Sequence, residues 1–231
     1  TLRRSSAASD VYKRQGKMQL ESLAQSGFDP LSRTCRFMLT EEAHHMFVGE
    51  TGVGRTIQAT VDAMTAAGIT DPYDTNRIRD LGVIDLPTIQ KKLNLHYSLS
   101  LDLFGNEVST NAANAFNAGI KGRYMEHRID DDHQLQRDTY DVKMVSEDQI
   151  VTEQMPALNA INMRLRDDYV KDASGGLTRW NKIMKRKNVD FEFRLPHEGF
   201  NRNIGVFANV SVDPQGNIIT VSYTHLRAHE T

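Results

Sequence analysis

The order of hydrophobic and polar positions predicts helices over most of the chain. Apolar residues recur at helical spacing from Leu31 to Ala67. Asp29-Pro30 precedes this stretch, and Gly68 follows it. An aspartate followed by proline is typical of a helix start, and glycine is typical of the position just past a helix end. The pattern therefore predicts one long helix between these signals.

Two further segments show the same helical pattern. Asp85 and Pro87 open a stretch that continues to about Ala118, and Pro156 opens another that includes ALNAINMRLRDDYV. Within a helix, glycine costs about 1 kcal/mol relative to alanine. Glycines in the first helix therefore predict a kink, a bulge or a close contact with a neighbouring helix: Gly49, Gly52 and Gly54.

Short alternating segments predict strands in the second half of the chain. YDVKMV and IVTEQM, separated by SEDQ, predict a hairpin near 138–154. VDFEFRLP (189–196) alternates like a strand, and VFANVSV and NIIT flank a Pro-Gly turn typical of a second hairpin. Helices that precede short strands indicate a mainly α fold with small β-hairpin appendages, not alternating βαβ units.

Composition narrows the class of protein. The chain has 231 residues, 39% hydrophobic and 25% charged, with a net charge of −2. No polybasic region suggests a nucleic-acid partner, and no apolar run approaches the roughly 20 residues that a membrane-spanning helix needs. The single cysteine, Cys35, excludes an internal disulfide framework and favours a reducing, cytoplasmic location. We interpret it as a small buried hydrophobic residue.

Both ends of the chain look foreign to the rest. Residues 1–15 and 221–231 resemble translated sequencing-adapter read-through, so we expect the genuine sequence to be an internal piece covering 16–220. Within it we expect a helical bundle portion over 16–186 and a small β-containing extension over 187–220.

The stretch TEEAHHMFVGETGVGRT (40–56) carries the strongest candidate chemistry. Residues three apart lie on one face of a helix, so Glu-x-x-His directs a carboxylate oxygen and an imidazole nitrogen toward one point. Di-iron helical bundles use such half-sites. Two registers are possible, Glu41 with His44 and Glu42 with His45. We favour Glu42 and His45 as metal ligands, because their face is the more uniformly small and apolar.

Two other interpretations of this stretch remain open on spacing alone. Residues 49–56 match a P-loop except that Arg55 replaces the lysine, and a broad guanidinium suits that position poorly. Alternatively, the acidic and histidine residues form an ordinary polar pair on a solvated helix. The chain would then be a P-loop NTPase in the first case, and a non-catalytic helical scaffold or binding module in the second.

Other candidate residues carry weaker signals. Asp130-x-x-His133 could complete a di-iron site with Asp102, but the hydrophilic run around it favours a solvated turn. His96 is interpreted as a core or interface histidine whose polar atoms have partners, and Trp180 as a core residue. The sequence identifies no catalytic side chain and no organic-cofactor site.

Long strings of the chain resemble one enzyme family. GKMQLESLAQSGFDPLSRTCRFMLTEEAHHMFVGETGVGR, GVIDLPTIQKKLNLHYS, NAGIKGR, MPALNAINMRLRDDYV, TRWNKI and LPHEGFNRNIGVFANV are similar to the oxygenase components of benzoyl-CoA 2,3-epoxidases. The resemblance covers nearly all of 16–220 and implies a partial ferritin-like helical bundle with a non-haem di-iron centre. It also implies O₂ as co-substrate, benzoyl-CoA as substrate, and NADPH-derived electrons from a separate flavin and iron–sulfur reductase.

The resemblance also assigns metal ligands and exposes a gap. It places the family's last Glu-x-x-His on Glu42 and His45. A further iron-binding aspartate of the family falls on Lys13, which cannot be a ligand, and the remaining ligands fall upstream of the chain. Asp102, Asp130 and His133 are then not ligands. We therefore expect the 231-residue chain by itself to be inactive.

Overall fold

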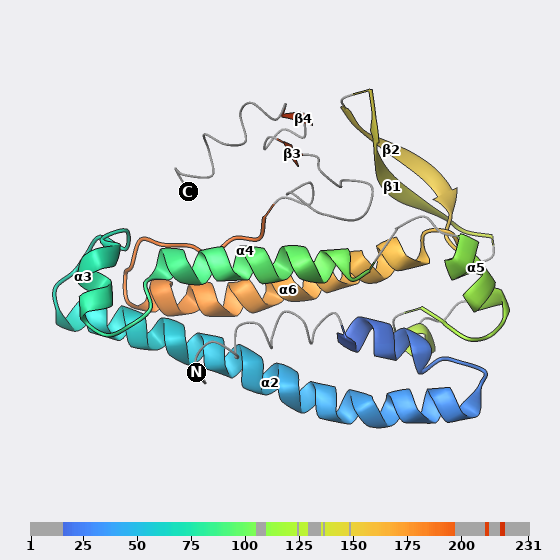
Figure 1. Cartoon of the computed structure of the whole chain (residues 1–231), viewed down its shortest axis with the longest axis horizontal. Helices are drawn as coiled ribbons and strands as arrows, with labels where there is room; N and C mark the ends of the chain where they lie inside the picture. Colours follow the sequence, from blue (N-terminus) through green and yellow to red (C-terminus); the bar gives the residue numbers. More distant parts are fainter. Residues whose placement is uncertain are drawn as a thin grey trace. The chain divides into compact units, whose positions relative to one another are not determined.

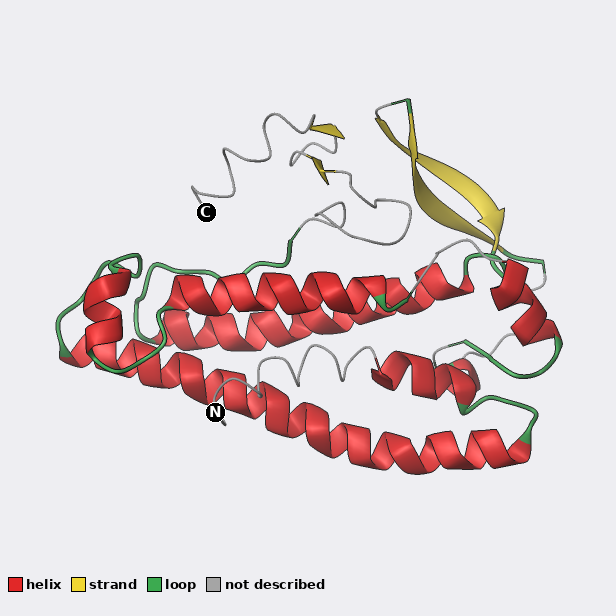
Figure 2. Cartoon of the chain, viewed as in Figure 1, coloured by secondary structure: helices red, strands yellow, loops and turns green. Residues whose placement is uncertain are grey.

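The computed structural model describes residues 16–104, 110–123, 125–128, 135, 137–147, 149–196, 211–212 and 218–219. Over these residues the chain is mainly helical, with a two-stranded hairpin (Figure 2), so the predicted fold class is confirmed. After a helical stretch at 16–23, the elements are α2 (Asp29–Ala66), α3 (Thr75–Asp80), α4 (Leu86–Asp102), α5 (Thr110–Asn117), η1 (Glu126–Arg128), β1 (Thr139–Ser146), β2 (Gln149–Pro156), α6 (Ile161–Arg186), β3 (Ser211–Val212) and β4 (Ile218–Ile219) (Figure 1).

The long helix α2 agrees with the pattern that predicted it. It ends where Gly68 adopts a positive φ of 65°. The amide of Ile69 donates to the carbonyl of Met64 (2.9 Å), and the amide of Gly68 donates to that of Thr65 (3.3 Å). These two bonds satisfy carbonyls that the helix end leaves without partners. Glycine is suited to this position because it reaches positive φ without a Cβ clash.

The second predicted helix is divided, contrary to the prediction of one element reaching Ala118. α4 ends at Asp102, and residues 103–104 form a turn in which the amide of Phe104 donates to Leu101 (3.2 Å). Gly105-Asn106 follows this turn in the sequence, and both residues are poor helix formers. The low propensity of this pair explains why the hydrophobic pattern alone overestimated the helix length.

The third helix begins later than predicted. Pro156 is the last residue of β2, paired with Thr139, and residues 157–160 form a turn before α6 starts at Ile161. The amide of Ala157 donates to the carbonyl of Asp138 (2.9 Å), which ties this turn to the start of β1. A proline at the end of a strand removes no interior ladder bond, so both roles were compatible with the sequence.

The predicted first hairpin is confirmed, whereas the predicted strand at 189–196 is wrong. β1 and β2 pair antiparallel from Thr139 with Pro156 to Ser146 with Gln149. Residues 189–196 are described but contain no strand. Side-chain amides bind the backbone groups of two of them, Phe193 and Arg194. Asn181 exchanges two 2.9 Å hydrogen bonds with the backbone of Phe193.

The side-chain amide of Gln90 binds the backbone of the next residue, Arg194, in the same way. It donates to the Arg194 carbonyl (2.8 Å) and accepts from the Arg194 amide (3.0 Å). β3 and β4 pair antiparallel over the two residues described in each, and the remainder of the second predicted hairpin lies outside the described residues.

The structure divides into two compact units. The described part of the first unit comprises 16–17, Phe37–Tyr97 and Tyr169–Leu195. In this unit, portions of α2, α4 and α6 pack against one another (Figure 1). The hydrophobic core of the unit includes Trp180, which is only 3% exposed, as predicted for a core residue. The rings of Tyr97 and Tyr169 stack with centroids 5.8 Å apart between α4 and α6.

The described part of the second unit comprises 18–36, portions of 98–168, and residues 196, 211–212 and 218–219. It includes the β1–β2 hairpin. The hydroxyl of Ser22 donates to the carbonyl of Gly122. Tyr140 of β1 donates to Asp167 of α6 and contacts two hydrophobic clusters at the base of the hairpin. Cys35 is buried as predicted, and burial raises the pKa of its thiol.

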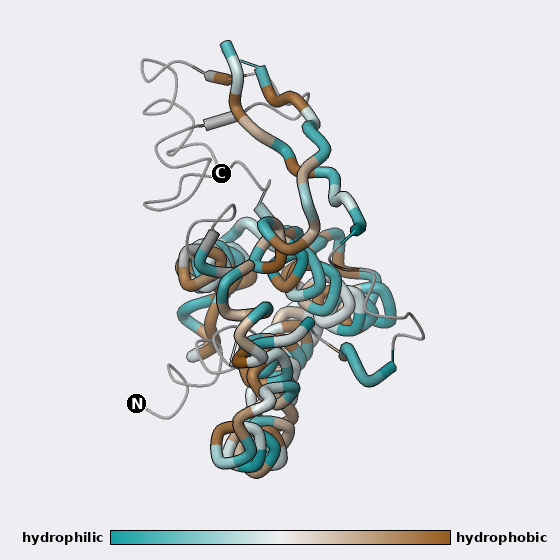
Figure 3. The backbone as a smooth tube through the Cα atoms, turned by 90° about the vertical axis from the view of Figure 1, so that its right-hand side faces the viewer, coloured by the Kyte–Doolittle hydropathy of each residue, from teal (hydrophilic) through white to brown (hydrophobic). Residues whose placement is uncertain are grey.

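Hydrophobic and hydrophilic positions are interspersed along the helices rather than segregated into long apolar blocks (Figure 3). Among the described residues, no helix combines the length and apolar character needed to cross a bilayer.

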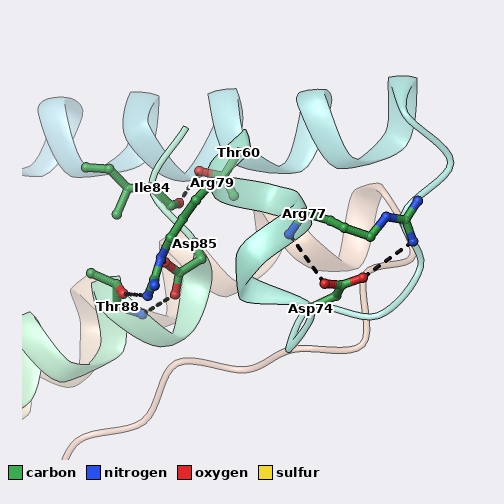
Figure 4. A network of polar contacts seen from close by, with 7 residues as sticks. All are labelled: Thr60, Asp74, Arg77, Arg79, Ile84, Asp85 and Thr88. Atoms are coloured by element: carbon green, nitrogen blue, oxygen red, sulfur yellow. Dashed lines mark hydrogen bonds and ion pairs between the residues drawn. The ribbon is translucent and has the colours of Figure 1, made fainter. Parts of the chain in front are cut away.

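A buried aspartate fixes the start of α4 in the first unit (Figure 4). Asp85 is 1% exposed; its Oδ1 accepts from the Thr88 amide (2.8 Å) and its Oδ2 accepts from Arg79 Nε (2.6 Å). The nearby carbonyl of Ile84 accepts from Thr60 of α2 (2.7 Å). The cap, the ion pair and the contact to α2 together define where α4 begins.

Replacing Asp85 with alanine is expected to lower the free energy of unfolding by about 1–2 kcal/mol, because the helix loses its cap and Arg79 loses its partner. Urea unfolding of the 231-residue chain measures this change. Asp74→Ala is the matched control. Asp74 also caps a helix, but its bond to the Arg77 amide is 3.4 Å long and exposed, so a smaller loss is expected. Equal losses would contradict the structural account.

The contribution of Asp85 is also expected to depend on pH. Burial alone would raise the pKa of this carboxyl, but hydrogen bonds from Arg79 and Thr88 outweigh it and hold the pKa below the ordinary 3.8. A lowered native pKa gives stability that is present above pH 3.8 and disappears as the pH falls through the native pKa. The difference in unfolding free energy between the wild type and Asp85→Asn should therefore shrink below that pH.

Replacing Asn181 with leucine is expected to release the segment 189–196, because two backbone groups of Phe193 lose their partners. Hydrogen exchange at the amide of Phe193 should accelerate at least about tenfold, the factor that corresponds to about 1.4 kcal/mol of lost protection. Exchange within β1 serves as the internal control and should not change. An unaltered rate at Phe193 would contradict this role of the amide.

Candidate functional site

Glu42 and His45 lie near the middle of α2, one helical turn apart. Because the helix is continuous through both residues, their side chains leave the same face, as the sequence predicted. Glu42 Oε2 and His45 Nδ1 are 3.3 Å apart. One carboxylate oxygen and one imidazole nitrogen are thus brought together at hydrogen-bonding distance.

The two side chains differ in exposure. The Glu42 side chain is 15% exposed, whereas that of His45 is 46% exposed. Gly16 lies against the carboxylate, since a Cβ built on it would approach Glu42 Oε1 to 3.2 Å. The absence of a side chain at Gly16 therefore lets the helical stretch at 16–23 begin close to Glu42. The carboxylate is largely covered, and the imidazole remains accessible to a further group.

The alternative register is more exposed. Glu41 and His44 are both exposed on α2, and the rings of His44 and His45 have centroids 6.3 Å apart and are tilted relative to each other. This placement gives Glu41 and His44 less protein around them than Glu42 has. Burial thus sets Glu42 apart from Glu41 but does not distinguish His45 from His44, because both imidazoles are exposed.

The separation of the Glu42 and His45 donor atoms suits one metal ion. Metal–oxygen and metal–nitrogen bonds near 2.1 Å, at angles between 90° and 110°, place neighbouring ligand atoms about 3.0–3.4 Å apart. The observed 3.3 Å falls in this range. A carboxylate oxygen and an imidazole are also suitable donors for iron. The pair therefore fits two positions around one metal ion without a change of backbone.

The described residues contain no group of three or more His, Cys, Asp or Glu side chains able to enclose a metal ion. Asp130 and His133 lie outside the described residues, as does the side chain of Asp102. Two donors from a single helix leave most coordination positions to be filled by other groups.

The P-loop interpretation is wrong for residues 49–56. All eight positions lie within α2, so their amides are used in helical hydrogen bonds and are not free to surround a phosphate. The hydroxyl of Thr56 donates to the carbonyl of Gly52 (3.0 Å). Gly54 lies beside Trp180, with a built Cβ 3.8 Å from the indole. The sequence predicted that these glycines produce a kink, a bulge or a close contact with a neighbouring helix. Gly54 makes such a close contact, with Trp180 of α6.

His96 lies on α4 and is partly covered. Burial, followed by the nearby charge of Lys92, lowers the pKa of its imidazole. His96 is half-buried, so it lies at the edge of the packed helices.

A surface groove between α2 and α6 was not found from the sequence. It is lined by Phe47, Glu50, Thr51, Gly54, Arg55, Gln58, Trp180, Ile183 and Arg186. The α2 members recur at intervals of three and four, which places them on one helical face. That spacing was visible in the sequence, but the partner face of α6 and the orientation of Trp180 were not.

Comparison with known proteins gives one extensive match. The chain is 54% identical over 216 residues to a protein named benzoyl-CoA oxygenase component B from Aromatoleum evansii. The match covers 93% of this chain and 45% of the relative, so the chain spans less than half of that protein's length. No protein-family model matches the chain. The resemblance identified from the sequence is confirmed by this relative.

Proposed function

We propose that this chain is a portion of a di-iron oxygenase component that epoxidises the aromatic ring of benzoyl-CoA, and that Glu42 and His45 are two of its iron ligands. The observation that carries the proposal is the 54% identity to benzoyl-CoA oxygenase component B over 93% of the chain. The 3.3 Å spacing of the two donor atoms on α2 supports the choice of ligands.

The proposed reaction explains why a metal centre is required. The thioester withdraws electrons from the ring, which makes the ring a poor nucleophile toward mild oxidants. When bound, a pair of iron ions would supply the reducing power toward O₂ that this chemistry needs, with electrons delivered by a separate flavin and iron–sulfur reductase that uses NADPH. A water-excluding pocket would protect the oxidant.

The role of this chain's own residues follows from their positions. Glu42 would contribute a carboxylate oxygen and His45 an imidazole nitrogen to the same metal ion. Gly16 would keep the neighbouring segment close to Glu42 without blocking its oxygen. The free, buried thiol of Cys35 agrees with the cytoplasmic location included in this proposal.

The chain alone is expected to be incomplete. A di-iron bundle takes about six protein ligands from four helices, and this chain is proposed to supply two of them. Lys13 occupies the position of a family aspartate, where a cation would repel iron. That position is three residues before Gly16, the residue that lies against Glu42.

The purified 231-residue chain is expected to bind far fewer than the roughly two irons per chain of a complete di-iron site. Iron content after anaerobic loading with Fe(II) and desalting measures this. A stoichiometry near that of a complete site would contradict the proposed incompleteness. A longer protein, with the native upstream sequence restored and aspartate in place of Lys13, should reach it.

In that longer protein, Glu42→Ala is expected to reduce iron affinity at least about tenfold, because a direct ligand is lost. Glu41→Ala is the matched control, since Glu41 is the adjacent exposed glutamate and should leave iron binding unchanged. Equal effects of the two substitutions would reject the assigned register. Absence of iron from the unsubstituted longer protein would instead favour the helical scaffold.

A further inference from the structure

The groove between α2 and α6 has a volume of about 460 Å³ and lies entirely within the first unit. On the α6 side, Trp180 is 3% exposed, and its indole N–H donates to the carbonyl of Glu50 (3.3 Å). Gly54 brings the α2 backbone close to the same indole, since a Cβ built on it would lie 3.8 Å away. The groove is therefore bounded by an aromatic ring that is held against α2.

The groove carries an excess of positive charge. Arg55 of α2 and Arg186 of α6 are exposed members of its lining, and neither has an ion pair or hydrogen bond within the described part of the chain. The carboxylate of the lining, Glu50, accepts from Arg179 at both of its oxygens. Because this carboxylate already has a cationic partner, the two lining arginines give the groove a net attraction for anionic groups.

The exposure of the lining indicates a macromolecular partner and not a small ligand. Phe47 is 69% exposed, and the adjacent Val48 is 50% exposed. A small-molecule site buries most of its ligand's surface, which a lining with Phe47, Arg55 and Arg186 exposed does not provide. Exposed aromatic and arginine side chains are instead enriched at contacts between proteins. The groove fits a protein surface that offers carboxylates and an apolar side chain.

The number of charges favours a protein over a nucleic acid. A nucleic-acid strand requires cations repeated along the groove to follow its phosphates. The lining offers two such arginines, in a chain whose net charge is −2. A protein surface with a few carboxylates is complementary to this smaller number of cations.

The groove lies across α2 from the proposed iron ligands. At about 100° per residue, Phe47 is about 160° around the helix from His45 and about 140° from Glu42. Phe47 is only two residues beyond His45, about 3 Å along the axis. A partner bound at Phe47 is therefore separated from the ligand face by roughly one helix diameter, about 10–12 Å. A substrate must reach the metal itself, whereas electrons pass between centres that do not touch, so this position suits an electron donor.

We propose that this groove is the docking surface for the flavin and iron–sulfur reductase, with Arg55 and Arg186 pairing with carboxylates of the reductase and Phe47 contacting an apolar side chain. The inference rests on the proposed function, which requires electrons from a separate protein. Docking at the groove leaves the face of α2 with Glu42 and His45 uncovered by the reductase.

Charge reversal tests the two arginines. Biolayer interferometry measures binding of a purified reductase of this class to the 231-residue chain and to the longer protein described above. Arg55→Glu and Arg186→Glu are each expected to weaken binding about tenfold, because each replaces an attraction with a repulsion. Binding by the unsubstituted proteins should also weaken as the salt concentration rises.

Lys185→Glu is the matched control for these reversals and should change binding little. Lys185 is exposed and adjacent to Arg186, but it lies about 100° around α6 from it and is not part of the groove lining. The three substitutions change the net charge equally. The control therefore separates a contact at the groove from an effect of overall charge.

Phe47→Ala tests the apolar contact and is expected to weaken reductase binding about tenfold or more, as for an aromatic residue at the centre of an interface. Phe37→Ala is the matched control. Phe37 is on the same helix and is 70% exposed, against 69% for Phe47, but it lies outside the groove lining. Circular dichroism of every variant verifies that the helices are retained.

Absence of reductase binding by both proteins would overturn the proposal, as would an affinity that the three groove substitutions leave unchanged or that the two controls reduce equally. Saturable binding of a single-stranded oligonucleotide that is lost in Arg55→Glu, without reductase binding, would replace the reductase with nucleic acid. Dimerisation in analytical ultracentrifugation that is lost in Phe47→Ala, again without reductase binding, would replace it with a second copy of this chain.

The failure of this docking surface and the failure of the proposed function give different results, because binding is measured independently of iron content. Iron in the longer protein without reductase binding would reject only the docking surface. Reductase binding through the groove by a longer protein that holds no iron would reject the di-iron assignment.

Discussion

The continuity of α2 through its glycine-containing stretch is the constraint on which the other features of the first unit depend. A helix with several glycines loses propensity, yet here it remains unbroken from Asp29 to Ala66. Packing against α6 offsets that loss, because Gly54 admits the indole of Trp180 beside the α2 backbone. This same continuity places Glu42 and His45 on one face and forms one wall of the groove.

Much of the fold follows from local sequence signals. Gly68 marks the end of α2, and the alternation around SEDQ marks the hairpin, because both depend on residues close together in the chain. Element boundaries failed where two local signals competed. Pro156 is compatible with the end of a strand and with the start of a helix, and only its pairing with Thr139 decides between them.

The candidate site was predictable only to the level of one helix. Spacing brings Glu42 and His45 together, but it could not show that Gly16 lies against the carboxylate, since that contact joins segments 26 residues apart. The groove depends on which face of α6 meets α2, a long-range choice that periodicity leaves undetermined. The P-loop pattern failed for the converse reason, because helical hydrogen bonding occupies the amides that the motif requires.

The amide side chains that hold residues 189–196 have a consequence for self-association. This segment has the alternating apolar pattern of a strand, with Phe191 and Phe193 in edge-to-face contact (5.2 Å between centroids). Backbone groups of Phe193 and Arg194 are bound by Asn181 and Gln90 instead of a neighbouring strand. Bound in this way, they cannot template the edge-to-edge pairing of separate molecules that leads to aggregates. Asn181 and Gln90 thus oppose the strand pairing between molecules that the alternating sequence of 189–196 would otherwise favour.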